Sequence, residues 1–145
     1  MRLNRRVVEK IREIVGEKNV LSDKASLTCY SIDFFPGKTC KPDLVVKPQE
    51  VKQIVRIVRL ANLEKFPVIP RGAGTSVTGG VVPVKGGVIL DLADMDHILD
   101  FDVDNLQVTV EAGIVWDKLN KFLGKKDSFF PQLQEVQVFL LLEVL

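Results

Sequence analysis

Apolar residues recur at helical spacing in three parts of the chain, with shorter apolar runs between them. The spacing predicts helices over residues 5–15, 50–65 and 115–124. We expect the first helix to end at Gly16, because glycine is favoured directly after a helix. The second helix is expected to bury one face, made of Val51, Ile54, Val55, Val58 and Ala61.

Short apolar runs predict extended segments between these helices. The expected strands are 44–46, 66–69 and 88–92, and a hairpin is expected to pair residues 98–101 with 106–111. The strand–helix–strand order from 44 to 69 predicts a βαβ unit. With the hairpin and the last helix added, the chain is predicted to be an α+β protein without internal repeats.

A glycine-rich loop follows the strand predicted at 66–69. The eleven residues from Pro70 to Gly80 contain four glycines, three hydroxyl residues and one arginine. Glycine permits positive φ and a close approach of other groups, and successive N–H groups in such a turn form an anion-binding concavity. Ligands of α/β sheets bind at the carboxyl ends of strands. The loop is therefore a candidate phosphate site, and a glycine turn without a ligand is the alternative.

Two familiar phosphate-binding templates do not fit this loop. In a P-loop, Gly80 and Val81 would have to be a lysine and a hydroxyl residue. In the Rossmann fingerprint, Val77 would have to be the third glycine, and a helix should follow. Residues 81–87 instead read as extended chain and a turn. Both nucleotide-binding motifs are excluded.

A longer string of residues resembles one flavoprotein family. The loop, residues 87–92 with Met95, and Val110-Glu111-Ala112-Gly113 are similar to the FAD-linked oxidases of the p-cresol methylhydroxylase or vanillyl-alcohol oxidase type. Within that family, the closest likeness is to the D-lactate dehydrogenase and glycolate oxidase D-subunit branch. Residues 27–33 and 42–48 fit the same pattern. The resemblance runs from about residue 7 to 131, and implies the N-terminal βαβ subdomain of a type-2 FAD-binding domain, followed by the start of its second mixed α/β subdomain.

The resemblance implies FAD as the cofactor. Arg71 to Ser76 would supply backbone donors to the FAD pyrophosphate, and the last two glycines would let the chain turn beneath the cofactor. For the side chain of Arg71, orienting the turn is as good an interpretation as contacting phosphate. The residues expected to bind FAD are Pro70, Arg71, Gly72, Ala73, Gly74, Thr75, Ser76, Gly79 and Gly80.

The family resemblance also implies a reaction class. The chain would be the FAD-binding portion of a flavin-dependent 2-hydroxyacid dehydrogenase or oxidase, in which hydride passes from the α-carbon of a small D-lactate- or glycolate-type substrate to FAD. No catalytic residue is assigned, because the substrate domain of the family is missing here. Two alternatives stay open: a non-catalytic module of the same fold that binds no flavin and self-associates, and the FAD domain of a different oxidoreductase.

Composition narrows the partners and the location. Twenty basic and nineteen acidic residues among 145 create no field that would attract nucleic acid, and no apolar run is long enough for a membrane span. Cys29 and Cys40 match no metal or redox motif and no secretion signal is evident, so a cytoplasmic protein with two reduced, partly buried thiols is expected. His97 is the only histidine, which excludes a histidine metal cluster within this chain.

The acidic residues after the strand at 88–92 and along the hairpin are predicted to form neither a metal site nor an acid/base pair. Residues 100–111 come near to an EF-hand loop, but Asn105 replaces its glycine and no flanking helices are expected, so we predict no metal site. Asp91, Asp94 and Asp96 are expected to be solvated turn carboxylates rather than an acid/base pair.

The last fourteen residues differ from the rest of the chain. Residues 132–145 contain no glycine or serine, where the family continues with Asp-Pro-Ser-like and Ile-Gly-Gly-Asn-like segments. We therefore expect a domain over residues 1–131 and an atypical apolar tail over 132–145, produced by a frameshift or truncation. A genuine terminal strand or helix is the alternative.

Overall fold

The computed structural model describes residues 3–33, 37, 39–76 and 78–131, and the tail predicted at 132–145 lies outside them. Its helices are α1 (Arg5–Val15), α2 (Lys24–Cys29), α3 (Val51–Glu64) and α4 (Trp116–Leu123). Its strands are β1 (Val20–Leu21), β2 (Leu44–Val46), β3 (Val68–Arg71), β4 (Val88–Asp91), β5 (Ile98–Asp102) and β6 (Gln107–Val110). Short 3₁₀ turns follow α1 at Glu17–Asn19 and α4 at Gly124–Lys126.

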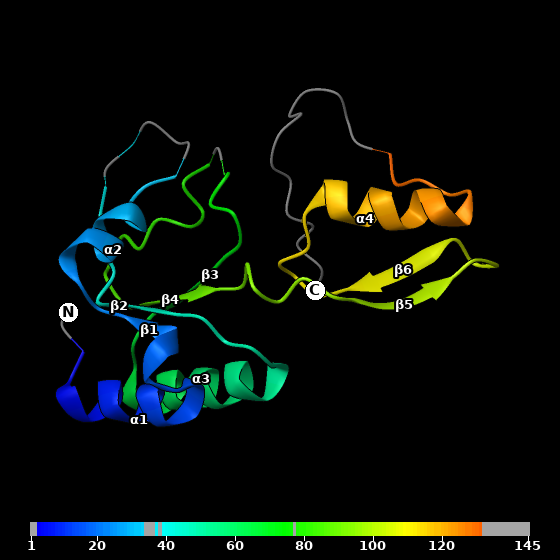
Figure 1. Ribbon diagram of the computed structural model, residues 1–145. Coiled ribbons are helices and arrows are strands. Elements are labelled where there is room, and N and C mark those ends of the chain that lie inside the picture. The colour runs from blue at the N-terminus through cyan, green and yellow to red at the C-terminus, as the bar shows by residue number, and fades with distance from the viewer. Residues whose placement is uncertain (1–2, 34–36, 38, 77, 132–145) are drawn as a thin grey trace.

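Strands β1 to β4 form one sheet in the order β1-β2-β4-β3 (Figure 1). β2 and β3 both pair with β4 in parallel, whereas β1 pairs with β2 in the antiparallel sense. The predicted βαβ unit is present, but β4 is inserted between its two strands. As a result, the carboxyl ends of β2, β4 and β3 lie along one edge of the sheet.

The central strands are buried on both faces, as is usual for parallel strands covered by helices and loops. Leu44 and Val46 of β2 pack with α1 and α3 in one hydrophobic cluster, together with Val88 and Leu90 of β4. Val45 of β2 and Ile89 of β4 are also fully buried. They point to the opposite face of the sheet, because side chains alternate along a strand. Figure 1 shows α1 and α3 below the sheet and α2 with the loops above it.

The buried face of α3 differs in part from the prediction, which holds for Ile54 and Ala61. Ile57, Leu60 and Ala61 are buried against the sheet and α1, whereas Val51, Val55 and Val58 are 62%, 42% and 40% exposed. The helix carries two neighbouring apolar stripes, and residue spacing by itself does not distinguish between them. The positions of α1 and the sheet bring the second stripe inward.

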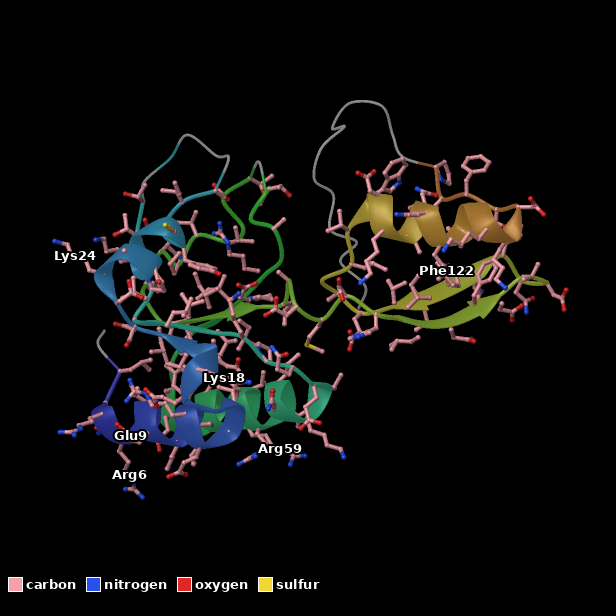
Figure 2. The ribbon with its side chains drawn as sticks, viewed as in Figure 1. Arg6, Glu9, Lys18, Lys24, Arg59 and Phe122 are labelled. Atoms are coloured by element: carbon pink, nitrogen blue, oxygen red, sulfur yellow. The ribbon has the colours of Figure 1, made fainter. Side chains whose placement is uncertain are left out.

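The predicted hairpin is confirmed, with α4 packed on one of its faces (Figure 1). Val110, Ile114, Leu119 and Leu123 form its small core. Figure 2 shows Phe122 pointing from α4 toward the strands, where its ring meets that of Phe101 edge to face at a centroid distance of 5.9 Å.

Two further expectations concern the cysteines and the membrane. Cys29 is exposed and Cys40 is half-buried, and both are free thiols, so the expectation of partial burial holds only for Cys40. Within the part of the chain that the structure describes, no helix has the length and apolar character that a bilayer crossing requires.

Candidate functional site

The glycine-rich loop leaves the carboxyl end of β3, where parallel sheets bind ligands. Pro70 and Arg71 are still part of the strand, and Gly72 begins the loop. Gly74 and Gly79 have φ of +74° and +78°, a backbone region that residues with a side chain rarely occupy. Two of the loop glycines are therefore required by the backbone itself.

The second half of the loop is closed by the hydroxyl of Ser76. Its Oγ accepts hydrogen bonds from the backbone N–H groups of Thr78 and Gly80, each at 3.3 Å. The Thr78 hydroxyl lies 3.2 Å from the same oxygen. A single side chain thus gathers two backbone donors and a second hydroxyl at one point.

The first half of the loop contains backbone N–H groups without a hydrogen-bond acceptor among the described residues. Among the described residues, neither the N–H of Ala73 nor that of Gly74 has an acceptor. Because backbone N–H groups in native proteins are nearly always paired with protein, water or ligand, these two donors are available to an external acceptor. Of the nine predicted site residues, Pro70 has no backbone N–H, and the N–H of Gly80 is already bonded to Ser76 Oγ.

The side chain of Arg71 contacts protein rather than projecting freely. Its Nη1 donates a hydrogen bond to the carbonyl oxygen of Ile32 at 2.9 Å, and its guanidinium carbon lies 5.2 Å from the centroid of the Tyr30 ring. The same guanidinium lies against Gly74, where an added Cβ would be 2.1 Å from Nη2. Arg71 therefore connects the glycine loop with residues 30–32.

A buried polar cluster continues from Tyr30. The Tyr30 hydroxyl donates a hydrogen bond to Asp91 Oδ2, and Lys47 Nζ lies 3.4 Å from the same oxygen. Asp91 Oδ1 accepts the N–H of Ala93 at 3.1 Å. Burial, together with the hydrogen bond to Asp91, raises the pKa of Tyr30 well above its usual value.

The expectation of a solvated turn carboxylate is wrong for Asp91, which is only 4% exposed. The reason is its place in the sheet. Asp91 ends β4 two residues after Ile89, so it points to the same face, and it pairs in register with Arg71 of β3. Lys47 follows β2 with the same alternation. The sequence does place Asp91 and Lys47 at the ends of two apolar strands. That the two side chains meet could be inferred only once the strand order was known.

Comparison with known proteins identifies the family. A family model described as an FAD binding domain matches residues 42–138 of the chain, which include β2 to α4 and the whole glycine loop. The chain belongs to this FAD-binding domain family.

The chain spans about a quarter of the length of the curated relatives that it matches. It is 32% identical to the glycolate oxidase subunit GlcD of Bacillus subtilis, over 86% of this chain and 27% of that protein. It is 31% identical to the probable mitochondrial D-lactate dehydrogenase of Danio rerio, over 87% of this chain and 25% of that protein. It is also 31% identical to the mitochondrial D-2-hydroxyglutarate dehydrogenase of Arabidopsis thaliana, over 89% of this chain and 23% of that protein.

Solved structures agree on the fold. A crystal structure of p-cresol methylhydroxylase with substrate bound superposes with a TM-score of 0.75 at 27% identity, over 85% of this chain and 25% of that one. An alkyldihydroxyacetonephosphate synthase superposes with a TM-score of 0.77 over 86% of this chain and 28% of that one; at 23% identity, this likeness concerns the fold alone. The predicted fold, that of a p-cresol methylhydroxylase-like FAD-binding domain, is confirmed over about a quarter of the length of these structures.

Proposed function

We propose that this chain binds FAD through the loop from Pro70 to Gly80, with the cofactor's diphosphate against the N–H groups of the loop. The observation that carries the proposal is the pair of N–H groups of Ala73 and Gly74, which have no acceptor among the described residues. They lie at the carboxyl end of β3 in a chain of the FAD-binding domain family.

The residues present fit a diphosphate chemically. Backbone N–H groups and hydroxyls are all neutral donors that can point at one anion, and the loop supplies both kinds. The positive φ of Gly74 and Gly79 turns the chain twice within a few residues, which lets successive donors face one concavity. FAD, when bound, supplies the hydride acceptor of the reaction, and this chain's part is to hold and orient it.

We further propose that the substrate of the whole protein is a small 2-hydroxy acid. Three of the similar proteins carry names that refer to glycolate, D-lactate and D-2-hydroxyglutarate, and all three acids have a hydroxyl on the carbon next to a carboxylate. Anaerobic addition of D-lactate or glycolate to the FAD-loaded protein tests this class, since hydride transfer bleaches the flavin absorbance. Bleaching by a phenol such as p-cresol, and by neither acid, would contradict it.

The FAD proposal is tested by titrating the flavin-free chain with FAD and following flavin fluorescence. We expect saturable binding, and a purified protein with flavin absorbance bands. Gly74→Ala should weaken FAD binding about tenfold, because the new methyl group meets the guanidinium of Arg71 and the backbone there has a positive φ.

The matched control is Gly124→Ala, at the end of α4. Gly124 has an ordinary helical φ of −61° and nothing within 4 Å of an added Cβ, so FAD affinity should not change. A wild-type chain that is folded by circular dichroism and yet shows no FAD binding would remove the proposal and leave the non-flavin module as the better interpretation.

A further inference from the structure

We infer that Arg71 is a positioning residue that holds the glycine loop in shape through Tyr30, and that its side chain is not a ligand of the phosphates. The effect on FAD affinity rests on the proposed function; the contact between the two side chains does not. Tyr30 lies forty residues before the loop, outside the motif by which the loop is identified.

Arg71 makes three contacts, two with residues 30–32 and one within the glycine loop. Its Nη1 donates to the Ile32 carbonyl, its guanidinium faces the Tyr30 ring, and its Nη2 lies against Gly74. The hydrogen bond to the carbonyl fixes the direction of the guanidinium, and the Tyr30 ring lies against one flat face of the group. The position of the group is therefore set by contacts within the protein.

Tyr30 is fixed in turn from its other end. Its hydroxyl donates to the buried carboxylate of Asp91, which Lys47 neutralises. Asp91 stands at the end of β4, the strand beside β3. The ring under Arg71 is therefore tied to the rigid sheet, and the chain of contacts runs from the sheet through Tyr30 and Arg71 to Gly74.

One consequence distinguishes this arrangement from direct phosphate binding. If Arg71 does not contact the diphosphate, the loop meets the cofactor with neutral donors. FAD affinity should then depend only weakly on salt, because salt screens charge pairs far more than neutral hydrogen bonds. An arginine–phosphate contact would make the affinity fall with added salt, and an Arg71→Met variant would abolish that dependence.

The inference is tested by a double-mutant cycle on FAD affinity in the full chain. Arg71→Met and Tyr30→Leu should each raise the FAD Kd about tenfold, and the double variant should also raise it about tenfold rather than a hundredfold, because both changes break one contact. Tyr30→Phe keeps the ring and should stay within about threefold of wild type. Arg59→Met is the matched control: Arg59 extends outward from α3, as Figure 2 shows, and the variant should bind FAD normally.

A second measurement needs no flavin. In NMR spectra of the flavin-free chain, the side-chain signals of Arg71 should be displaced by the ring current of Tyr30. They should stay displaced in Tyr30→Phe and return to ordinary positions in Tyr30→Leu. If the wild-type chain binds no FAD, the proposed function fails, and these spectra still decide the contact.

Three results would overturn the inference: additive losses in the cycle, a loss confined to the Arg71 variants, or undisplaced Arg71 signals in the wild type. If Tyr30→Leu does not fold, Arg71→Lys replaces it. Lysine keeps the charge without the planar group, so it should lose as much FAD affinity as Arg71→Met. Recovery of affinity with lysine would indicate a direct charge contact with the phosphates and would also overturn the inference.

Discussion

The sheet region, residues 3–95, and the hairpin region, residues 96–131, are built in different ways. In the sheet region, the central strands are buried on both faces and the polar groups at their carboxyl ends join segments far apart in the chain; Tyr30 and Asp91 are 61 residues apart. In the hairpin region, neighbours in sequence are neighbours in space, and α4 covers one face of two adjacent strands.

The polar pairs follow the same division. Asp91 of the sheet region is buried, with tyrosine, lysine and backbone partners. His97 of the hairpin region is largely exposed and bonds to Glu111, the residue directly after β6. The cluster around Asp91 joins distant segments and can position a ligand loop. The pair of His97 and Glu111 joins two nearby segments and is a surface contact. Each region also carries its own optical probe, because Tyr30 and Trp116 are the only tyrosine and tryptophan.

The largest effect is expected where the two regions meet, at Gly113. Its N–H donates to the Met95 carbonyl at 2.8 Å, and an added Cβ would lie 2.0 Å from the carbonyl oxygen of Leu92. Gly113→Ala should therefore lower the free energy of unfolding by about 3 kcal/mol. Urea denaturation, followed by Trp116 fluorescence and Tyr30 absorbance in parallel, measures the loss.

Gly124→Ala is the control for this comparison as well. It should raise the free energy of unfolding by no more than about 1 kcal/mol. In wild type, the two probes should report coincident transitions, as expected of one cooperative unit. Separate transitions, with only that of Trp116 moved by Gly113→Ala, would show that the regions unfold independently.

A smaller effect is expected at Tyr30 in the sheet region. Tyr30→Phe removes the hydroxyl donor from buried Asp91, and should cost about 1.5 kcal/mol near neutral pH. The folded-state pKa of Tyr30 is raised above its ordinary 10.0, so the stabilisation is fully present below pH 10 and is lost as the pH rises further. The difference in stability between wild type and Tyr30→Phe should shrink above pH 10. A difference that stays constant up to high pH would contradict the raised pKa.

The smallest effect is expected at Glu111 in the hairpin region. Burial by itself would raise the pKa of Glu111, but hydrogen bonds from the backbone N–H and ring of His97 outweigh it and lower the pKa below the ordinary 4.5. The stabilisation is therefore present above pH 4.5 and is lost as the pH falls. Glu111→Gln should cost less than about 1 kcal/mol, and the difference from wild type should vanish in acid.

Asp104→Asn, at the exposed turn of the hairpin, is the matched carboxylate control. It should change the free energy of unfolding by no more than about 0.5 kcal/mol. If Glu111→Gln had a larger effect than Tyr30→Phe, the contrast between a buried long-range cluster and a surface pair would not hold.

Sequence patterns predicted those features that depend on neighbouring residues. The hairpin was predicted because its alternation and its turn are local, and the loop because its glycines follow an apolar strand directly. The predicted face of α3 was right for Ile54 and Ala61, which pack on the core. It was wrong for Val51, Val55 and Val58, because their spacing is as regular as that of the buried stripe. The insertion of β4 between β2 and β3 was not predicted, because strand order depends on which segments pack together.

The residue order is enough to establish the glycine loop and its place after a strand, because the need for positive φ at Gly74 and Gly79 belongs to each residue separately. What the side chain of Arg71 does could be seen only in the folded chain. Its partners are Tyr30 and Ile32. Tyr30 is bonded to Asp91, which strand register places beside Arg71. Backbone preference is a local property, whereas a side chain's partners depend on how distant segments pair.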